Sequence, residues 1–212
     1  MLRLWLGRHG ETEWNLQGRY QGQVDTALSA RGVEQGKALA RAMAEVPLDA
    51  VVASPLSRAR DTAAGAAEAH GLTVVTDARW TEIHHGTWEG RYSTDIARTD
   101  GARLVAWRTA PETVTMPEGE SLHDVRARVR DALADYIHRY DGKTVLVVAH
   151  DAVNKVLLAD ILGLSTAHFW QFKQDNGCLN LLEYEDGIWR IVTLNATSHL
   201  GYLCSGIVQR GL

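Results

Sequence analysis

An arginine and a histidine stand together where a short apolar segment of the chain ends. Residues 2–6 are apolar apart from Arg3, and Arg8, His9 and Gly10 follow. Open α/β sheets bind ligands just beyond the carboxyl ends of their strands, where the backbone turns and leaves room. This arrangement predicts a phosphate-binding site in which His9 acts as a nucleophile or base. Taken alone, a histidine at such a place is more often an ordinary residue of a strand-to-helix loop.

A second segment repeats the pattern of a hydrophobic strand followed by a reactive side chain. Residues 48–53 are predominantly apolar and lead into Ser54 and Pro55. Serine is a favoured N-cap and proline a favoured first helical residue. We therefore expect a helix that begins here and carries Arg58 in its first turn.

Two further segments complete the pattern. Residues 143–149 form an almost continuous apolar run that ends at His150, as is typical of a central parallel strand buried on both faces. Residues 73–76 precede a loop in which we expect Glu82 to be a buried carboxylate. Two arginines, two histidines and one carboxylate are thus expected at one edge of a single sheet.

Composition is that of an ordinary globular protein. The chain has 212 residues, of which 45% are hydrophobic and 23% charged, so we expect one domain over residues 1–212. A net charge of −4 gives no general attraction to nucleic acid or anionic membranes. The N-terminal apolar run is too short for a signal peptide or a membrane span, and Cys178 and Cys204 resemble buried thiols of a reducing compartment. These features favour a cytoplasmic protein.

Helical segments alternate with the strands, which predicts an α/β fold with a mostly parallel central sheet in a three-layer α/β/α sandwich. Ser121 and Asp124 resemble a capping box at the start of one helix. The helices are expected at residues 29–46, 57–70, 121–140 and 152–162.

The last part of the chain changes its period. Residues 179–184 and 189–194 flank a Glu-Asp-Gly turn, which predicts a hairpin at one edge of the sheet. Residues 100–119 hold two of the four prolines and little periodicity. We expect residues 83–120 to form a loop-rich cap over the site.

These motifs, in this order, resemble those of the histidine phosphatase superfamily and its phosphoglycerate mutase-like branch. The resemblance covers nearly the whole chain. Its motifs are Arg8-His9-Gly10-Glu11-Thr12-Glu13-Trp14-Asn15, Arg19-Tyr20-Gln21-Gly22, Leu28-Ser29-x-Arg31-Gly32, Ser54-Pro55-Leu56-x-Arg58-Ala59, Glu82-Ile83-x-x-Gly86-x-Trp88-x-Gly90, Gly119-Glu120-Ser121 and Val147-Val148-Ala149-His150.

The resemblance implies a role for each central residue. His9 would attack the phosphorus and form a phosphohistidine. Arg8, Arg58 and His150 would hold the phosphoryl oxygens. Glu82 would protonate the leaving alkoxide and then accept a proton from water, which requires a carboxyl whose pKa is raised by burial.

Other positions match the family less specifically. Asn15, Gln21 and Gly22 correspond to residues that line the phosphate pocket, although each is equally well explained as an ordinary loop residue. No metal or other cofactor is expected, because protein cations would do the electrophilic work. None of the nine histidines has zinc-type spacing with supporting ligands.

One position departs from the family pattern. The histidine of the last motif is commonly followed by glycine, whereas Asp151 follows His150 here. Aspartate is a favoured N-cap, and this interpretation comes first. The alternative is that Asp151 contacts a cationic or hydroxyl group of the substrate.

Hydrolysis is favoured over mutase chemistry, because the segment between Glu82 and His150 leaves little chain for a lid that excludes water. Within the family the chain looks most like metal-independent phosphoserine phosphatases, in which His85 would bind the substrate carboxylate or merely line the pocket. This finer resemblance rests on residues 82–86, 19–22, 169–170 and 195–201.

Alternatives stay open at this point. Broad-specificity and α-ribazole phosphatases share most of these motifs, and a phosphoglycerate mutase is less favoured. A non-catalytic module that binds phospho-ligands is least favoured, because it would be expected to lack His9 or Glu82. We expect a small phosphomonoester as ligand and no nucleic-acid or membrane partner, and a homodimer is compatible with the sequence.

Overall fold

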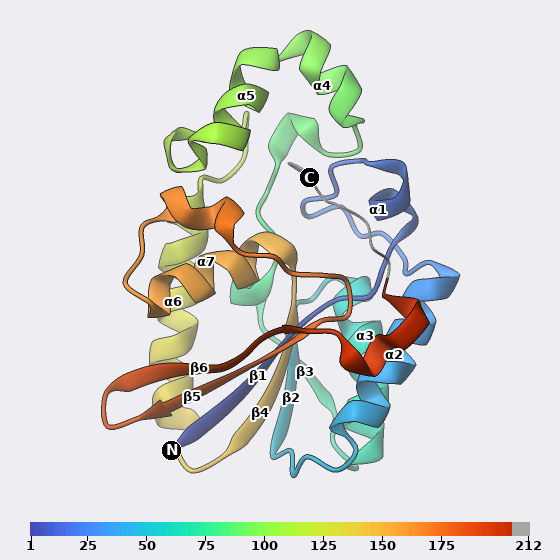
Figure 1. Ribbon diagram of the computed structural model, residues 1–212, viewed down its shortest axis with the longest axis vertical. Coiled ribbons are helices and arrows are strands. Elements are labelled where there is room, and N and C mark those ends of the chain that lie inside the picture. Colours follow the sequence, from blue (N-terminus) through green and yellow to red (C-terminus); the bar gives the residue numbers. More distant parts are fainter. Residues whose placement is uncertain (205–212) are drawn as a thin grey trace.

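The computed structural model describes residues 1–204, in which six strands form one sheet between two layers of helices (Figure 1). The strand order is β3-β2-β4-β1-β5-β6. The first four strands in this order are parallel, β5 pairs antiparallel with β1, and β6 pairs antiparallel with β5. The predicted three-layer fold with a mostly parallel sheet is confirmed. The strands are β1 (Leu2–Arg8), β2 (Ala50–Ala53), β3 (Val74–Thr76), β4 (Thr144–Ala149), β5 (Leu179–Glu185) and β6 (Ile188–Ala196).

Helices flank the sheet and form a cap above it. The α-helices are α1 (Glu13–Gln17), α2 (Ala30–Met43), α3 (Ser57–Ala69), α4 (Ser93–Thr99), α5 (Gly101–Thr109), α6 (Leu122–Arg139) and α7 (Asp151–Ile161). Short 3-10 helices are η1 (Ala78–Trp80), η2 (Gly86–Trp88), η3 (Pro111–Thr113), η4 (Thr166–Gln171) and η5 (Ser198–Leu203). No helix within residues 1–204 is long and apolar enough to cross a membrane.

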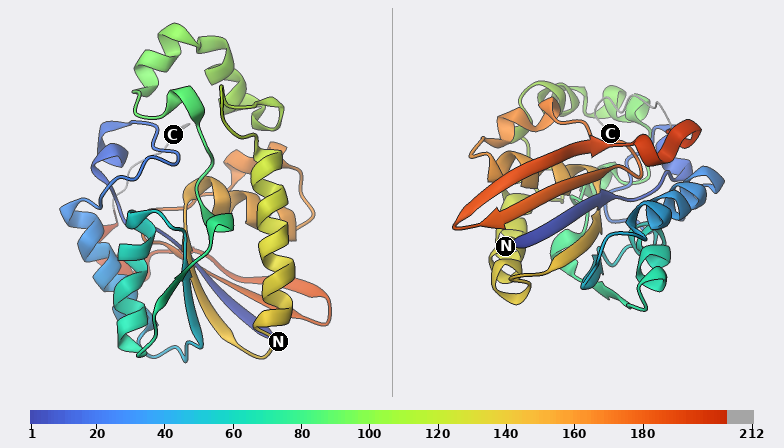
Figure 2. Two further views of the ribbon diagram at one scale, coloured as in Figure 1. Left: turned by 180° about the vertical axis from the view of Figure 1, so that it is seen from behind. Right: turned by 60° about the horizontal axis from the view of Figure 1, so that its bottom comes forward.

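Strand β4 shows how the sheet packs on both faces. Its side chains alternate, so Val145 and Val147 join the apolar core with α6 and α7. Leu146 and Val148 join the separate core with α2 and α3. All six residues of β4 are buried, as predicted for a central parallel strand. Figure 2 shows the two helical layers on either side of the sheet.

Side chains cap the N-termini of the helices and thereby fix the loops that connect strands to helices. Ser29 caps α2 by accepting a hydrogen bond from the Gly32 N–H, and Ser121 and Asp124 form the predicted capping box at α6. The prediction that Ser54 caps the next helix is wrong. Helix α3 begins at Ser57, whose N–H donates to the carboxylate of Asp25 at 2.7 Å. A carboxylate from a distant loop thus replaces the local serine.

The predicted C-terminal hairpin is confirmed at the sheet edge. Strands β5 and β6 pair antiparallel and are joined by Asp186 and Gly187, which have φ of 51° and 81°. Two consecutive residues with positive φ are typical of the tight turn that matches the twist of paired strands.

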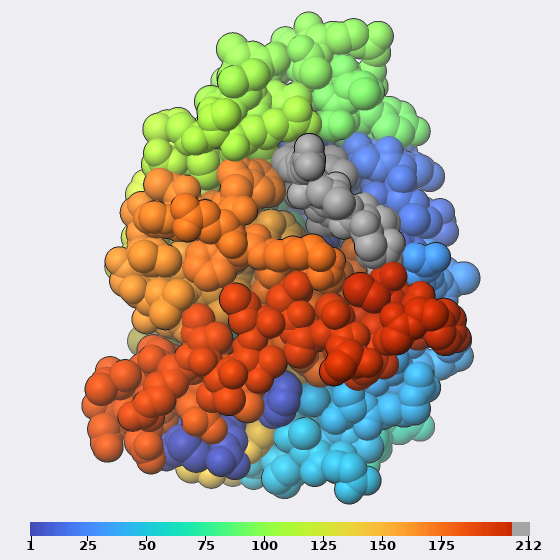
Figure 3. Space-filling view, viewed as in Figure 1, coloured from blue at the N-terminus to red at the C-terminus, as the bar shows by residue number. Residues whose placement is uncertain are grey.

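The cap differs from its prediction. Residues 100–119 were expected to be loop-rich, but Gly101–Thr109 form α5, and α4 precedes it. Leu104 and Trp107, three residues apart, bury one face of α5 in the main core, and such a short helix shows little periodicity in sequence. Helices α4 and α5 form one end of the molecule (Figure 3).

Candidate active site

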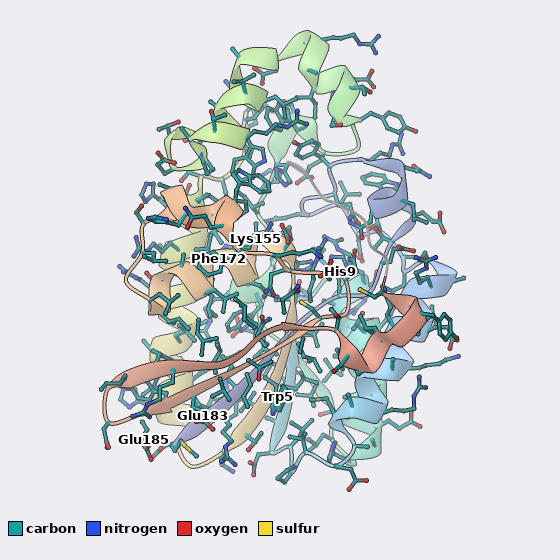
Figure 4. The ribbon with its side chains drawn as sticks, viewed as in Figure 1. Trp5, His9, Lys155, Phe172, Glu183 and Glu185 are labelled. Carbon is teal, nitrogen blue, oxygen red and sulfur yellow. The ribbon has the colours of Figure 1, made fainter. Side chains whose placement is uncertain are left out.

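The carboxyl ends of the central strands bring the predicted residues together. Strands β1 and β4 are paired with Arg8 opposite Ala149, so His9 and His150 follow at the same edge. The two imidazole rings lie 5.1 Å apart between centroids. Figure 4 shows His9 beyond the ends of the strands. Every predicted site residue except His150 lines a single pocket: Arg8, His9, Asn15, Gln21, Gly22, Arg58, Glu82, His85 and Asp151.

The ring of His9 is oriented by a backbone contact. Its Nδ1 lies 2.6 Å from the carbonyl oxygen of Gly10, which can only accept, so Nδ1 carries the proton. Burial, followed by the charges of Arg58 and Arg8, holds the pKa of His9 well below its usual range. At neutral pH the Nε2 lone pair is therefore free to attack an electrophile.

Gly10 keeps the turn after β1 tight against α2. A Cβ at this position would lie 2.5 Å from the carbonyl oxygen of Gly32. The N–H of Gly10 also donates to the hydroxyl of Thr62 on α3 at 2.9 Å. This close packing fixes the loop that carries His9.

Arg58 is held by two backbone carbonyls. Its Nη2 donates to Gly22 O at 2.7 Å and its Nη1 to Val24 O at 2.8 Å. Burial lowers the pKa of Arg58 to about 10, so it remains a cation at neutral pH. Its Nε has no partner among residues 1–204 and can donate to a bound anion.

Gly22 is required by the shape of this loop. Its φ is 52°, and a Cβ there would lie 2.0 Å from an oxygen of Glu89. A side chain at this position would displace the carbonyl that orients Arg58.

Arg8 and His150 carry further nitrogen atoms that can donate hydrogen bonds near His9. Arg8 donates through Nη1 to Gln174 O at 2.5 Å, and its Nε is buried without a partner in the described part of the chain. Both ring nitrogens of His150 are likewise buried and without a partner there. Burial and then the charge of Arg58 lower the pKa of His150 well below its usual range, so it is a neutral donor.

Glu82 is a buried carboxyl held by two backbone N–H groups. Oε1 accepts from Ile83 at 2.9 Å, and Oε2 accepts from Ala152 in the first turn of α7 at 3.3 Å. Burial, followed by the negative charge of Asp151, raises the pKa of Glu82 above its usual range. A carboxyl with a raised pKa that lines the pocket with His9 is suited to general acid and base chemistry.

Asn15 and Gln21 are oriented by their amide oxygens. Asn15 Oδ1 accepts from the N–H of Thr12 and from Asn176, at 3.0 and 3.2 Å. Gln21 Oε1 accepts from the hydroxyls of Thr12 and Thr26, at 2.7 and 2.6 Å. With both oxygens occupied, the amide NH₂ groups are left to donate to a ligand in the pocket.

His85 lies in an aromatic setting at the part of the pocket nearest the cap. Its ring meets the rings of Tyr20 and Trp107 edge-on, at centroid distances of 5.0 and 6.1 Å. Burial lowers the pKa of His85 to about 3, so its imidazole is neutral at physiological pH. Its Nδ1 is buried and has no partner among the described residues.

Four residues that line the pocket were not predicted from the sequence as site residues: Arg19, Trp107, Ala152 and Phe169. Arg19 stacks on the rings of Trp14 and Tyr92, with its guanidinium carbon 5.1 and 4.6 Å from their centroids. Only the family motif containing Arg19 could have indicated it. Trp107 reaches the pocket from α5, a helix that the sequence did not predict.

The favoured interpretation of Asp151 as an N-cap is wrong. His150 occupies the N-cap position of α7, and Asp151 is the first residue inside the helix. Its side chain pairs instead with Lys155 one turn later, at 2.7 Å. Lys155 was also missed, although the spacing of four residues between opposite charges is a recognisable signal.

No group of three or more histidine, cysteine or acidic side chains within residues 1–204 could hold a metal ion. The positive charges of the pocket come from Arg8, Arg19 and Arg58, and a small phosphorylated molecule is the ligand class that such a set of donors suits.

A buried neutral histidine, two buried arginines and a buried carboxyl form a set of groups that is suited to phosphoryl transfer. The sequence matches the histidine phosphatase superfamily (branch 1) over residues 4–197, and the chain belongs to this family. It is a phosphatase, that is, a phosphoric monoester hydrolase.

Individual relatives cover almost the whole chain. The chain is 37% identical to phosphoserine phosphatase 1 of Hydrogenobacter thermophilus, over 95% of each chain. It is 31% identical to the adenosylcobalamin/alpha-ribazole phosphatase of Salmonella typhimurium, over 92% of this chain and 96% of the relative. Among solved structures, Bacillus stearothermophilus YhfR superposes with a TM-score of 0.91 at 30% identity, covering 94% of this chain and all of that one.

Proposed function

We propose that this protein hydrolyses a small phosphomonoester without a metal ion, through a phosphohistidine on His9. Nε2 of His9 attacks the phosphorus while the bond from phosphorus to the ester oxygen breaks, and Glu82 gives its proton to the leaving alkoxide. Water then attacks the phosphohistidine, Glu82 takes a proton from that water, and the bond between phosphorus and His9 breaks to release phosphate. The carboxyl of Glu82 is thus restored at the end of the cycle.

The donors around His9 support this sequence of steps. Arg8 and Arg58 each retain a buried Nε without a partner in residues 1–204, and His150 retains both ring nitrogens. These groups can hold the phosphoryl oxygens through the loose transition state, together with the amides of Asn15 and Gln21. The positive charge of the two arginines provides the electrophilic assistance that a metal ion would otherwise supply.

We infer that L-phosphoserine is the preferred substrate, and the observation that carries this inference is the setting of His85. A buried imidazole without a partner for Nδ1 lines the pocket, and a neutral imidazole has one N–H to donate. A substrate carboxylate is the acceptor that such a donor suits, and the cation of Arg19, which lines the same pocket, favours the same negative group.

The relatives support this choice without deciding it. The phosphoserine phosphatase of Hydrogenobacter thermophilus is 37% identical to this chain, whereas the alpha-ribazole phosphatase of Salmonella typhimurium is 31% identical. An α-ribazole or broad-specificity phosphatase is therefore the main alternative.

The direct test is phosphate release from a panel of monoesters by the purified protein. The panel contains L-phosphoserine, phosphothreonine, 3-phosphoglycerate, α-ribazole phosphate and sugar phosphates. We expect the highest kcat/KM for L-phosphoserine. A higher kcat/KM for α-ribazole phosphate would favour an α-ribazole phosphatase. Similar kcat/KM values for all substrates would favour a broad-specificity phosphatase.

The same panel tests mutase chemistry. A mutase returns the phosphoryl group to its substrate, so 3-phosphoglycerate would give an isomeric phosphoglycerate with little free phosphate. We expect free phosphate from every substrate that the enzyme turns over.

A further inference from the structure

Asp151 places a buried negative charge beside a phosphate site, where a negative charge is unexpected. It is 5% exposed and lines the pocket with Arg8, His9 and Glu82. A carboxylate in this position repels the dianionic phosphate of a substrate, so its presence requires compensating partners or a favourable contact with another part of the substrate.

Lys155 supplies one compensating partner and fixes one carboxylate oxygen. Its Nζ donates to Oδ2 of Asp151 at 2.7 Å, one helical turn away on α7. The ammonium lies 5.0 Å from the ring centroid of Phe169 and 4.7 Å from that of Trp170. The two aromatic rings hold the lysine, and the lysine holds the carboxylate in one orientation.

The other oxygen, Oδ1, remains available. It is buried and has no hydrogen-bond partner within residues 1–204. It forms an ion pair with Nη1 of Arg8 at 3.5 Å, a distance too long for a good hydrogen bond. Once a substrate binds, the positive charge of the Arg8 guanidinium would also interact with the phosphate. This buried carboxylate oxygen lacks a hydrogen-bond donor, and a ligand could supply one.

We propose that Asp151 is a specificity-determining residue that accepts a hydrogen bond from an ammonium group on the substrate, so that the enzyme selects phosphomonoesters of amino alcohols. The inference rests on the proposed phosphatase activity and deepens its substrate class. A cationic donor satisfies Oδ1 and offsets the negative charge, whereas a hydroxyl satisfies the hydrogen bond alone.

Asp151 and His85 together would recognise an amino acid. His85 reaches the pocket from the loop before η2, and Asp151 reaches it from the start of α7. One would bind a carboxylate and the other an ammonium, while the arginines hold the phosphate. Three attachment points around one carbon atom distinguish L-phosphoserine from its D enantiomer.

The experiment uses four phosphate esters with the same two-carbon backbone. Phosphoethanolamine carries an ammonium, 2-hydroxyethyl phosphate a hydroxyl, phosphoglycolate a carboxylate and ethyl phosphate none of these. We would measure kcat/KM for the wild type, Asp151→Asn and Asp151→Gly. Asparagine keeps the shape without the charge, and glycine removes the side chain altogether.

For each variant, the ratio of phosphoethanolamine to ethyl phosphate turnover should fall by about tenfold to a hundredfold, as expected for loss of a charge-assisted hydrogen bond. The ratio of phosphoglycolate to ethyl phosphate should stay constant or rise. Ratios cancel any common effect of Asp151 on Glu82 or on the phosphate clamp. The matched control is Asp160→Asn, another α7 carboxylate that pairs with Arg126 and Arg130 away from the pocket, which should leave all ratios unchanged.

Equal losses for all four esters would overturn the inference, because Asp151 would then act only through other residues of the site. Equal losses for the ammonium and hydroxyl esters would also overturn it in favour of hydroxyl recognition. The inference would likewise be overturned if the wild-type enzyme showed no preference for phosphoethanolamine over ethyl phosphate. If this preference depends on Asp151 but L-phosphoserine is turned over no faster than phosphoethanolamine, the phosphoserine proposal fails and the ammonium site stands.

Discussion

The two ends of the pocket are built in different ways. At the phosphate end, backbone carbonyls orient the reactive side chains: Gly10 holds His9, Gln174 holds Arg8, and Gly22 holds Arg58. At the end nearest the cap, side chains hold one another through ring contacts, as Tyr20 and Trp107 do with His85.

This difference separates what the reaction needs from what the substrate needs. Backbone carbonyls fix donor positions whatever the neighbouring side chains are, so a phosphate site built on them suits any monoester. Ring contacts change whenever one side chain changes, so they suit the part of the pocket that distinguishes leaving groups. We therefore expect substitutions at the phosphate end to affect all substrates and those near the cap to affect some.

The largest effect is expected at the nucleophile. His9→Ala should lower kcat/KM for every ester by about 10⁴-fold or more, because no covalent intermediate can form. Rapid-quench labelling should trap an acid-labile, base-stable phosphoenzyme in the wild type alone. The control His70→Ala replaces a half-buried histidine that contacts Met43 O outside the pocket, and it should keep activity. Substantial turnover by His9→Ala would refute the phosphohistidine mechanism.

A smaller and substrate-dependent effect is expected at the general acid. Glu82→Gln should slow phosphorylation of His9 by an alkyl phosphate by about 10²–10⁴-fold, because the poor leaving group needs a proton. Para-nitrophenyl phosphate has a good leaving group and should lose much less in the same step. Equal losses of this step for both substrates would remove Glu82 from the role of acid.

The pH profile gives an independent measure of the same group. Burial and Asp151 raise the pKa of Glu82, and Glu82 must be protonated to act as an acid. For an alkyl phosphate, kcat/KM should therefore fall as the pH rises through that raised pKa. The Gln variant should lack this alkaline limb. An unchanged limb in the variant would assign it to another group.

The phosphate end was largely predictable from the sequence. Strand β4 is an almost continuous apolar run and β1 ends in a glycine turn, and parallel pairing brings Arg8 and His9 beside His150. Each of these signals is local, because it consists of residues that are neighbours in the chain. The cap at α3 could not be predicted in this way. Asp25, and not Ser54, supplies it, and Asp25 is distant from α3 in sequence.

The end nearest the cap was less predictable, because its residues are joined only by tertiary contacts. Trp107 comes from α5, whose two turns are too short to give a clear pattern. Lys155 is a buried cation that lies over the rings of Phe169 and Trp170. The only sign of it in the sequence is its spacing of four residues from Asp151. Burial of a lysine at such a place depends on aromatic residues that no local pattern connects to it.

A moderate and selective effect is expected at His85. Replacing a hydrogen-bond donor to a charged group typically costs about 1.5–3 kcal/mol, so His85→Ala should lower kcat/KM for phosphoserine by about one to two orders of magnitude. Para-nitrophenyl phosphate lacks the carboxylate and should lose much less. The neighbouring His84→Ala is the control, since His84 is 41% exposed and lies outside the pocket lining. Equal losses for both substrates would leave His85 as a wall residue.

The smallest effect is expected from removal of metal ions, and it tests the phosphate end as a whole. Arg8 and Arg58 carry the positive charge there, and Arg58 keeps that charge at neutral pH although burial lowers its pKa to about 10. Since phosphoryl transfer needs positive charge near the equatorial oxygens, a site without enough cations would depend on a divalent ion. Dialysis against a chelator should therefore change kcat/KM for phosphoserine by less than about twofold, well below the effect of any substitution above. Loss of activity that is restored specifically by one added metal would show that the arginines do not suffice, and the division of the pocket into an arginine-built phosphate end and a variable end near the cap would need revision.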